Sequence, residues 1–127
     1  MRRTLIGIVS AAVVLTLAAG PAAAKDGDVL RAGSCTKSST SKLKLSDEDG
    51  RIEVEFEVDQ NRNGIRWVVT LSRGSNRIAR LSRTTRPPSG SFEARILASN
   101  RAGADTFRAR ATSPSGEVCT ARATWQG

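Results

Sequence analysis

The chain has 127 residues, with 20 lysines and arginines against 12 acidic residues, a formal net charge of +8, two cysteines and no histidine. Its length predicts one compact domain. Without histidine, a Ser-His-Asp centre is excluded and a free cysteine has no imidazole base to activate it, so we expect a protein that is not an enzyme.

The first 24 residues have the pattern of an export signal. Arg2 and Arg3 form a positive start, residues 5–19 are apolar, and Ala22 to Ala24 match an A-x-A cleavage site. The apolar run of about 15 residues is shorter than the roughly 20 of a spanning helix, which favours cleavage over a retained membrane anchor. The arginine pair fits both general and twin-arginine export.

Cleavage would leave a secreted domain over residues 25–127, extracellular or associated with the cell envelope, with no membrane span. Its net charge would be +6, because Arg2 and Arg3 are lost. Fourteen of its 18 basic residues are arginines, which a GC-rich bacterial genome explains as readily as a binding function does.

The two cysteines are expected to pair in an oxidising compartment. Cys35 and Cys119 are 84 positions apart. A bridge between them would join the first strand to the last. In the chain-entropy model, closing a loop of this length contributes about 4 to 5 kcal/mol to stability.

Apolar and polar residues alternate with a period of two along most of the mature chain, and turn residues separate the alternating segments. No segment predicts a convincing helix. We therefore expect an antiparallel β-sandwich of seven or eight short strands, with a small barrel as the second choice. The predicted strands are 41–45, 51–59, 65–71, 77–85, 91–98, 106–112 and 117–125.

The clearest predicted strand is 51–59, which the Asn63-Gly64 pair separates from 65–71. Asn-Gly is a strong signal for a type I′ hairpin turn. A hairpin here would place Phe56 opposite Leu71 and Val58 opposite Val69.

Two resemblances follow from these segments. Cys35, Trp67 and Cys119 resemble the Cys…Trp…Cys theme of immunoglobulin-like sandwiches, although the spacing differs and no tyrosine is present. The stretches FEVDQNRNGIRWVV and ARATSPSGEVC, with the Pro-Ser-Gly-Ser-Phe turn between them, resemble small secreted actinobacterial single-domain β proteins. That resemblance implies a fold and a compartment, and it carries over no catalytic residue.

Asp59, Asn61 and Asn63, followed by Gly64, match the first half of an EF-hand calcium loop. The twelfth position, which should be a bidentate glutamate, is Thr70. A turn stabilised by Asx hydrogen bonds is therefore the simpler interpretation, and we expect neither a metal nor another cofactor.

Three glutamates alternate along the strand 51–59 and would project from one face. Paired carboxylates at this spacing resemble those of glycosidases. On an open sheet face, however, nothing should separate their pKa values. We instead expect Glu53, Glu55 and Glu57 to meet Arg66 and Arg80 across the sheet.

The surplus of positive charge predicts an anion-binding surface. Arginines gather around the strand 77–85, and the predicted site consists of Arg73, Arg77, Arg83 and Arg86. The partner would be an anionic cell-wall polymer or an acidic protein. Nucleic acid is disfavoured because four of the five aromatic residues fall on inward positions.

The sequence thus predicts a noncatalytic secreted binding module, extracellular or associated with the cell envelope. The alternative is a secreted inhibitor of an extracellular hydrolase that presents the loop 83–91, with Pro87 and Pro88 at its centre.

Overall fold

The computed structural model describes residues 24–127. The predicted leader, except for Ala24, lies outside this range. Within it the chain is all β, with nine strands and no helix, and therefore no helix able to span a membrane. The strands are β1 (Val29–Ala32), β2 (Ser34–Cys35), β3 (Thr40–Glu48), β4 (Arg51–Asp59), β5 (Arg66–Arg73), β6 (Asn76–Thr84), β7 (Ser91–Ser99), β8 (Asp105–Thr112) and β9 (Val118–Trp125).

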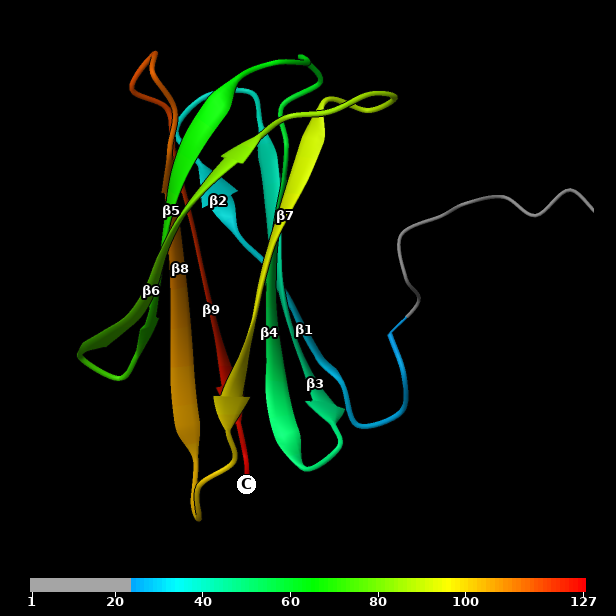
Figure 1. Cartoon of the computed structure of the whole chain (residues 1–127), viewed down its shortest axis with the longest axis vertical. Coiled ribbons are helices and arrows are strands. Elements are labelled where there is room, and N and C mark those ends of the chain that lie inside the picture. The colour runs from blue at the N-terminus through cyan, green and yellow to red at the C-terminus, as the bar shows by residue number, and fades with distance from the viewer. Residues whose placement is uncertain (1–23) are drawn as a thin grey trace, which may run out of the picture.

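The strands form two antiparallel sheets that face each other (Figure 1). The four-stranded sheet has the order β1-β3-β4-β7, and the five-stranded sheet has the order β2-β9-β8-β5-β6. The predicted two-layer, all-β architecture is thereby confirmed. The strands β3 to β9 correspond to the seven predicted segments, whereas β1 and β2 are too short to show a clear alternation.

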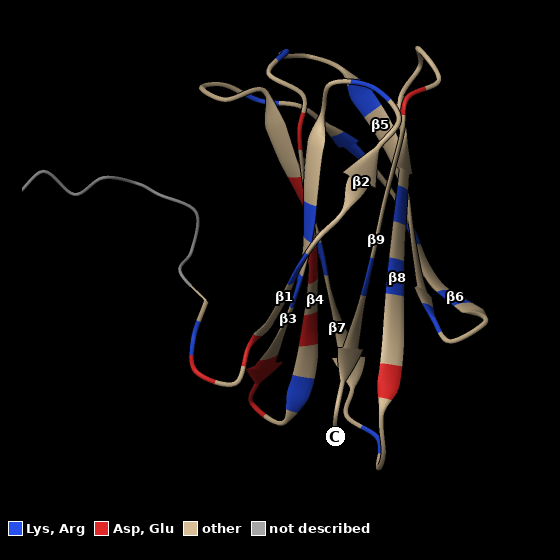
Figure 2. Ribbon diagram, turned by 180° about the vertical axis from the view of Figure 1, so that it is seen from behind, with Lys and Arg blue, Asp and Glu red and all other residues tan. Residues whose placement is uncertain are grey.

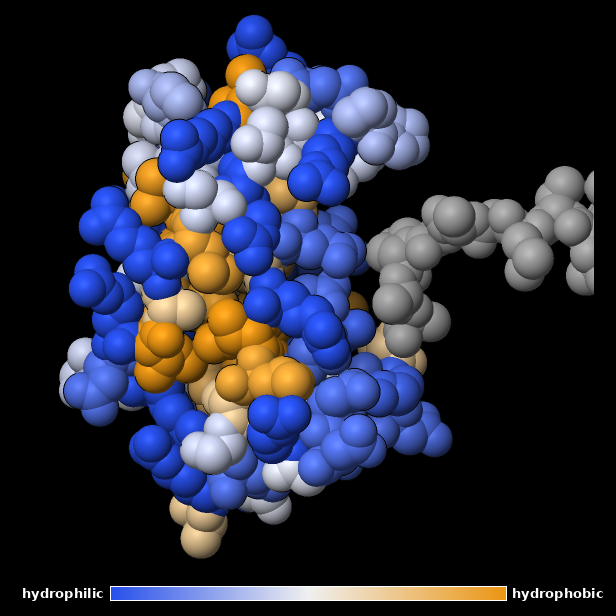
Figure 3. Space-filling model, viewed as in Figure 1, coloured by the Kyte–Doolittle hydropathy of each residue, from blue (hydrophilic) through white to orange (hydrophobic). Residues whose placement is uncertain are grey.

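The core lies between the sheets and consists of the inward residues of the alternating pattern. Phe56, Trp67 and Phe107 are its largest members and are fully buried. Along one side the sandwich ends in the edge strands β6 and β7, and Figure 3 shows apolar surface there. Ile78 of β6 and Leu97 of β7 are 39% and 38% exposed on these strands.

The predicted hairpin between residues 51–59 and 65–71 is wrong. β4 pairs with β3 and β7, and β5 pairs with β6 and β8, so the two strands lie in different sheets. The segment that contains Asn63 and Gly64 crosses between the layers. Its backbone is held by the loop after β6, because the Gly64 amide donates to the Thr85 carbonyl at 2.8 Å and the Thr85 amide donates to Ile65 at 2.9 Å.

A two-residue hairpin turn occurs instead at Asp49-Gly50, between β3 and β4. Both residues have positive φ, 51° and 80°, as a type I′ turn requires. The Asp-Gly pair carries the same kind of signal as Asn-Gly. On one side of β5, Leu71 pairs with Ala79 and Val69 with Leu81 of β6.

Candidate anion-binding face

The outer face of the five-stranded sheet is built by the strict alternation of β5, β8 and β9. On β8, Phe107 and Ala109 are buried in the core, so Arg108 and Arg110 point outward and are exposed. Arg122 is the outward, exposed residue of β9 at the position opposite Arg108.

Strand pairing aligns these outward residues in rows across the sheet. One row runs through Arg122, Arg108, Ser72 and Arg77, in which Arg77 is brought opposite Ser72 by a register shift in the β5–β6 pair. The next row runs through Ser34, Thr120, Arg110, Thr70 and Arg80.

Six exposed arginines are therefore spread over this face. None of them lies within 4.0 Å of a carboxylate among residues 24–127. The only acidic residue in the five strands is Asp105, which has the inward parity of β8. The six arginines are Arg66, Arg77, Arg80, Arg108, Arg110 and Arg122; we call this surface the arginine face.

The two sheets carry opposite charge. The strands of the five-stranded sheet contain eight arginines and one acidic residue, whereas those of the four-stranded sheet contain five basic and seven acidic residues. Figure 2 shows basic residues along β8 and β9 and acidic residues along β4. The positive charge of residues 24–127 is thus concentrated on one layer.

Three of the five basic residues in the strands of the four-stranded sheet form ion pairs with a neighbouring strand. The glutamates of β4 contact basic residues of β3 and β7. The predicted contacts with Arg66 and Arg80 are wrong, because those arginines lie on the other sheet. The observed ion pairs are Lys42–Glu57 at 3.4 Å, Lys44–Glu55 at 3.8 Å and Arg95–Glu53 at 2.9 Å.

The expectation of equal glutamate pKa values is also wrong. Burial, the hydrogen bond to Glu53 and the nearby Glu93 charge raise the pKa of Glu55 to about 7. The hydrogen bond from Arg95 lowers the pKa of Glu53 below its ordinary value. β4 is a central strand, so side chains from both neighbours cover its outer face and remove water from Glu55.

The four arginines predicted to bind anions do not form one surface. Arg73 is 6% exposed, is paired with Asp105, and lies 5.1 Å from the ring centroid of Phe107. Arg77 belongs to the arginine face, near the β5–β6 turn. Arg83 and Arg86 lie toward the other end of β6 and line a hollow of about 350 Å³.

Two hollows lie on the arginine face. The larger, of about 640 Å³, is lined by Arg31, Arg108, Arg110 and Arg122 together with neutral residues, among them Ser34, Thr70, Ser72 and Thr120. The second, of about 550 Å³, includes Arg66, Arg80 and Arg110. They share Thr70 and Arg110, so they form one continuous surface.

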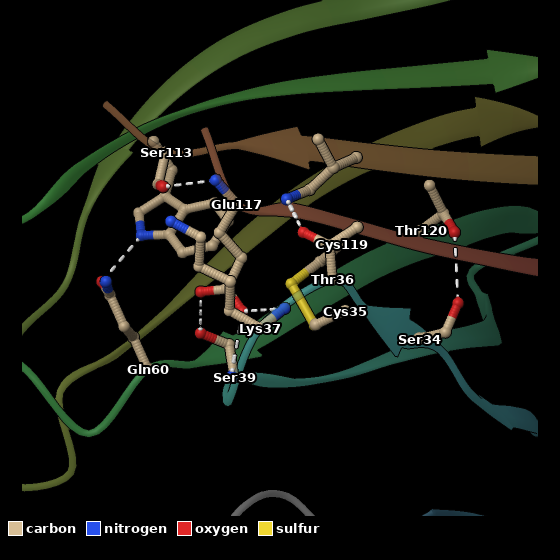
Figure 4. Close-up of a disulfide and its surroundings, with 12 residues drawn as sticks. Ser34, Cys35, Thr36, Lys37, Ser39, Gln60, Ser113, Glu117, Cys119 and Thr120 are labelled. Atoms are coloured by element: carbon tan, nitrogen blue, oxygen red, sulfur yellow. Dashed lines mark hydrogen bonds between the residues drawn. A yellow bond between two sulfur atoms is a disulfide. The ribbon is translucent and has the colours of Figure 1, made fainter. Parts of the chain in front are cut away.

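One wall of the larger hollow is the crossover from β1 to β2. The Gly33 amide donates to the Ser41 carbonyl at 2.8 Å. A Cβ at Gly33 would collide with Ser41 Oγ and the Thr120 carbonyl oxygen, so only glycine permits this close approach. The predicted disulfide joins Cys35 to Cys119 and holds the crossover against β9 (Figure 4).

A buried carboxylate reinforces the same region. Glu117 is 3% exposed and accepts hydrogen bonds from the amides of Lys37 and Ser39, at 3.0 and 3.1 Å, and from the Ser39 hydroxyl at 2.6 Å (Figure 4). The segment that follows Cys35 is therefore fixed to Glu117, the residue immediately before β9.

The residues considered for calcium form an ordinary turn. The Asn61 amide donates to Asp59 Oδ1 at 3.0 Å, and Asn61 has a φ of 56°. This is the Asx hydrogen bonding expected for the simpler interpretation. The carboxylates of Glu55, Glu57 and Glu93 also lie within 4.8 Å of one another, but Glu55 and Glu57 already pair with lysines.

Comparison of the chain with protein-family models, with curated proteins and with solved structures found no match.

The alternation within the segments 106–112 and 117–125 puts Arg108, Arg110 and Arg122 on outward positions but does not group them. Their alternation on two segments that pair in space was the available signal, because outward residues of adjacent antiparallel strands become neighbours.

Proposed function

We propose that this chain is an exported, noncatalytic binding module that takes anionic ligands on the arginine face. The observation that carries the proposal is a face with six exposed arginines and no carboxylate. Arg108 and Arg122 lie directly opposite each other on adjacent strands. Like charges in this position destabilise a sheet, and a bound anion would remove that repulsion.

The shape of the face favours an extended ligand. Adjacent strands lie about 4.8 Å apart, and successive outward residues of one strand are separated by about 6 to 7 Å. Arginines therefore recur both along the strands and across them, and this repetition offers successive contacts to a chain of regularly spaced charges. An anionic cell-wall polymer at the envelope has this chemistry, and an acidic protein segment is the other ligand of the same kind.

Single-stranded nucleic acid fits less well. Phe56, Trp67, Phe92 and Phe107 are buried in the core, and no aromatic residue lies on the arginine face. Stacking platforms for bases require exposed aromatic rings.

The strand order supports an immunoglobulin-like interpretation of the sandwich. The order β9-β8-β5-β6 matches the G-F-C-C′ arrangement, and the buried Trp67 lies on β5 at the position of strand C. The antibody-type bridge between sheets is absent from residues 24–127, because Cys35 and Cys119 lie on adjacent strands of one sheet. The resemblance to small secreted actinobacterial β proteins agrees with this interpretation.

The proposal is tested by retention on immobilised teichoic acid and heparin across a salt gradient. We expect retention to fall steeply with ionic strength, and the triple variant R108Q/R110Q/R122Q to elute at much lower salt. The control is R51Q/R62Q/R101Q, which removes the same charge from exposed arginines elsewhere. Equal losses in both variants would show that only net charge matters and would overturn the proposal.

Arg83 and Arg86, two of the four arginines predicted from the sequence to bind anions, are tested in the same assay. The double variant R83Q/R86Q alters the hollow at the end of β6 and leaves the arginine face intact. We expect its elution to stay close to that of the unmodified protein. A larger loss than in R108Q/R110Q/R122Q would transfer the site to Arg83 and Arg86.

A second candidate function is inhibition of an extracellular hydrolase by the loop after β6. The favouring observation is that this exposed loop is braced at its base. The Gln60 amide donates to the Gly90 carbonyl, and the amides of Arg86 and Gly90 donate to Ser91 and Arg86. Pro87 and Pro88 further restrict the loop. Incubation with a panel of proteases and glycosidases tests this function, and undiminished hydrolysis throughout would count against it.

A further inference from the structure

We propose that the larger hollow of the arginine face is an oxyanion subsite that binds one phosphate group between Arg108, Arg110 and Arg122. The inference rests on the proposed function and names the ligand group at its centre. The hollow has a volume of about 640 Å³, which is ample for a phosphate and part of the chain that carries it.

Arginines reach this hollow from three elements. Arg108 and Arg110 come from β8, Arg122 comes from β9, and Arg31 comes from β1, two residues before Gly33 of the crossover. A planar carboxylate has two oxygens and is satisfied by one guanidinium fork. Several forks that converge from different directions match a tetrahedral oxyanion, which has more oxygens and carries more charge.

The neutral lining of the hollow adds hydrogen-bond donors. Ser34, Thr70, Ser72 and Thr120 contribute hydroxyl groups on the same two rows as the arginines. A hydroxyl donates to phosphate oxygen as readily as to water. No acidic residue lines the hollow, so nothing in its lining repels an anion.

The choice of basic residue is consistent across the layer. All eight basic residues in the strands of the five-stranded sheet are arginines, whereas the ion pairs of β3 use Lys42 and Lys44. Arginine offers a rigid planar fork, whereas lysine offers a point charge. The face thus carries the side chain suited to bidentate recognition of phosphate oxygens.

The disulfide has a role in this subsite beyond stability. Cys35 immediately follows Ser34, and the bridge to Cys119 holds Ser34 opposite Thr120, where their hydroxyls lie 3.5 Å apart. The close contact of Gly33 with Ser41 and Thr120 also fixes the backbone immediately before Ser34. The wall that carries Arg31 is therefore preorganised before any ligand binds.

The subsite is tested by titrating the oxidised, isotope-labelled protein with inorganic phosphate at an ionic strength held constant with chloride. We expect saturable shifts of amide signals around Arg108, Arg110, Arg122 and Ser34. R108Q and R122Q should each weaken the apparent affinity about tenfold. The control R66Q removes an arginine of the same face that lies outside this hollow, and it should change the affinity less than twofold.

Two results would overturn the subsite. One is a phosphate response no larger than that of chloride, and the other is a loss in R66Q equal to that in R108Q. Either would leave salt-dependent retention on teichoic acid intact, so failure of the subsite is distinguishable from failure of the proposed function. Acetate at matched ionic strength should bind more weakly than phosphate, and equal binding would also count against a tetrahedral ligand.

The source of the phosphate is resolved by competition. A teichoic acid fragment that shifts the same signals and is displaced by inorganic phosphate would identify polymer phosphate as the ligand. Shifts with inorganic phosphate alone would identify free phosphate, and either outcome supports the oxyanion subsite.

The role of the wall is tested by R31Q and by C35S/C119S. We expect each to weaken phosphate binding severalfold while the β-sheet spectrum is retained. R31Q changes an exposed side chain and keeps the test valid if the double cysteine variant does not fold. Unchanged phosphate affinity in R31Q would show that Arg31 takes no part in phosphate binding.

Discussion

At the scale of single residues, the outer face of β4 shows how different neighbours give chemically identical groups different pKa values. Glu53 and Glu55 are two positions apart on one strand, yet the pKa of Glu53 is lowered by its hydrogen bond from Arg95 and that of Glu55 is raised to about 7 by burial. Lys44 contacts Glu55 at 3.8 Å without offsetting the loss of water.

Replacing Glu55 with glutamine should therefore stabilise the protein at neutral and alkaline pH. The folded pKa of about 7 exceeds the ordinary value of 4.5, so the folded state holds the proton more tightly and the stability of the unmodified protein falls as pH rises between these values. Glu55→Gln removes this loss. We expect a gain of about 1 to 3 kcal/mol at pH 8 and little gain at pH 4, measured by urea unfolding.

Glu57→Gln is the matched control. Glu57 lies on the same face of β4 as Glu55, and its carboxylate contacts Lys42 as that of Glu55 contacts Lys44. A Glu55→Gln variant less stable than the unmodified protein at pH 8 would show that the ion pair with Lys44 outweighs burial.

At the scale of elements, the loops that connect the two sheets depend on close backbone contact. Gly90 has a φ of 69°, and a Cβ there would collide with the backbone of Asn61 and Arg62. Two of the connections that pass between the layers at this end, 60–65 and 85–90, thus support each other.

Gly90→Ala should destabilise the fold by about 2 to 4 kcal/mol, because it combines an unfavourable backbone conformation with a steric collision. The control is Gly116→Ala, which has a φ of 87° but nothing within 4 Å of the added Cβ. Its cost should be about 1 kcal/mol, since only the backbone conformation is affected. Thermal unfolding measures both, and equal losses would show that the loop contact contributes nothing.

At the scale of the whole molecule, one disulfide connects the beginning of the described chain to its last strand. β2 has only two residues, so its attachment to β9 depends on the bridge between Cys35 and Cys119 more than on its ladder hydrogen bonds.

Removing the bridge with C35S/C119S should lower the free energy of unfolding by about 2 to 5 kcal/mol, because the unfolded chain regains the freedom of a long loop. Dithiothreitol should have the same effect on the unmodified protein and none on the double variant. Coincident unfolding curves for the oxidised and reduced protein would contradict this expectation.

The charge of the molecule is organised at this largest scale. Each arginine of β8 and β9 is an ordinary outward residue of its own strand, and the arginine face exists only because those strands pair with each other and with β5. The four arginines chosen from their closeness along the chain are instead separated, with Arg73 buried against Asp105.

The sequence by itself determined the strands β3 to β9, their inward and outward side chains and the pairing of the two cysteines. The strands and the directions of their side chains follow from a period-two pattern that is local to each strand. The disulfide follows because each cysteine has only one other cysteine to pair with. Only the tertiary structure decided which strands are neighbours. Asn63-Gly64 predicted a hairpin, but β4 already has β3 and β7 at its two edges, so β5 joins the other layer. Pairing depends on which edges are free once the sheets pack, and residue alternation contains no information about that choice.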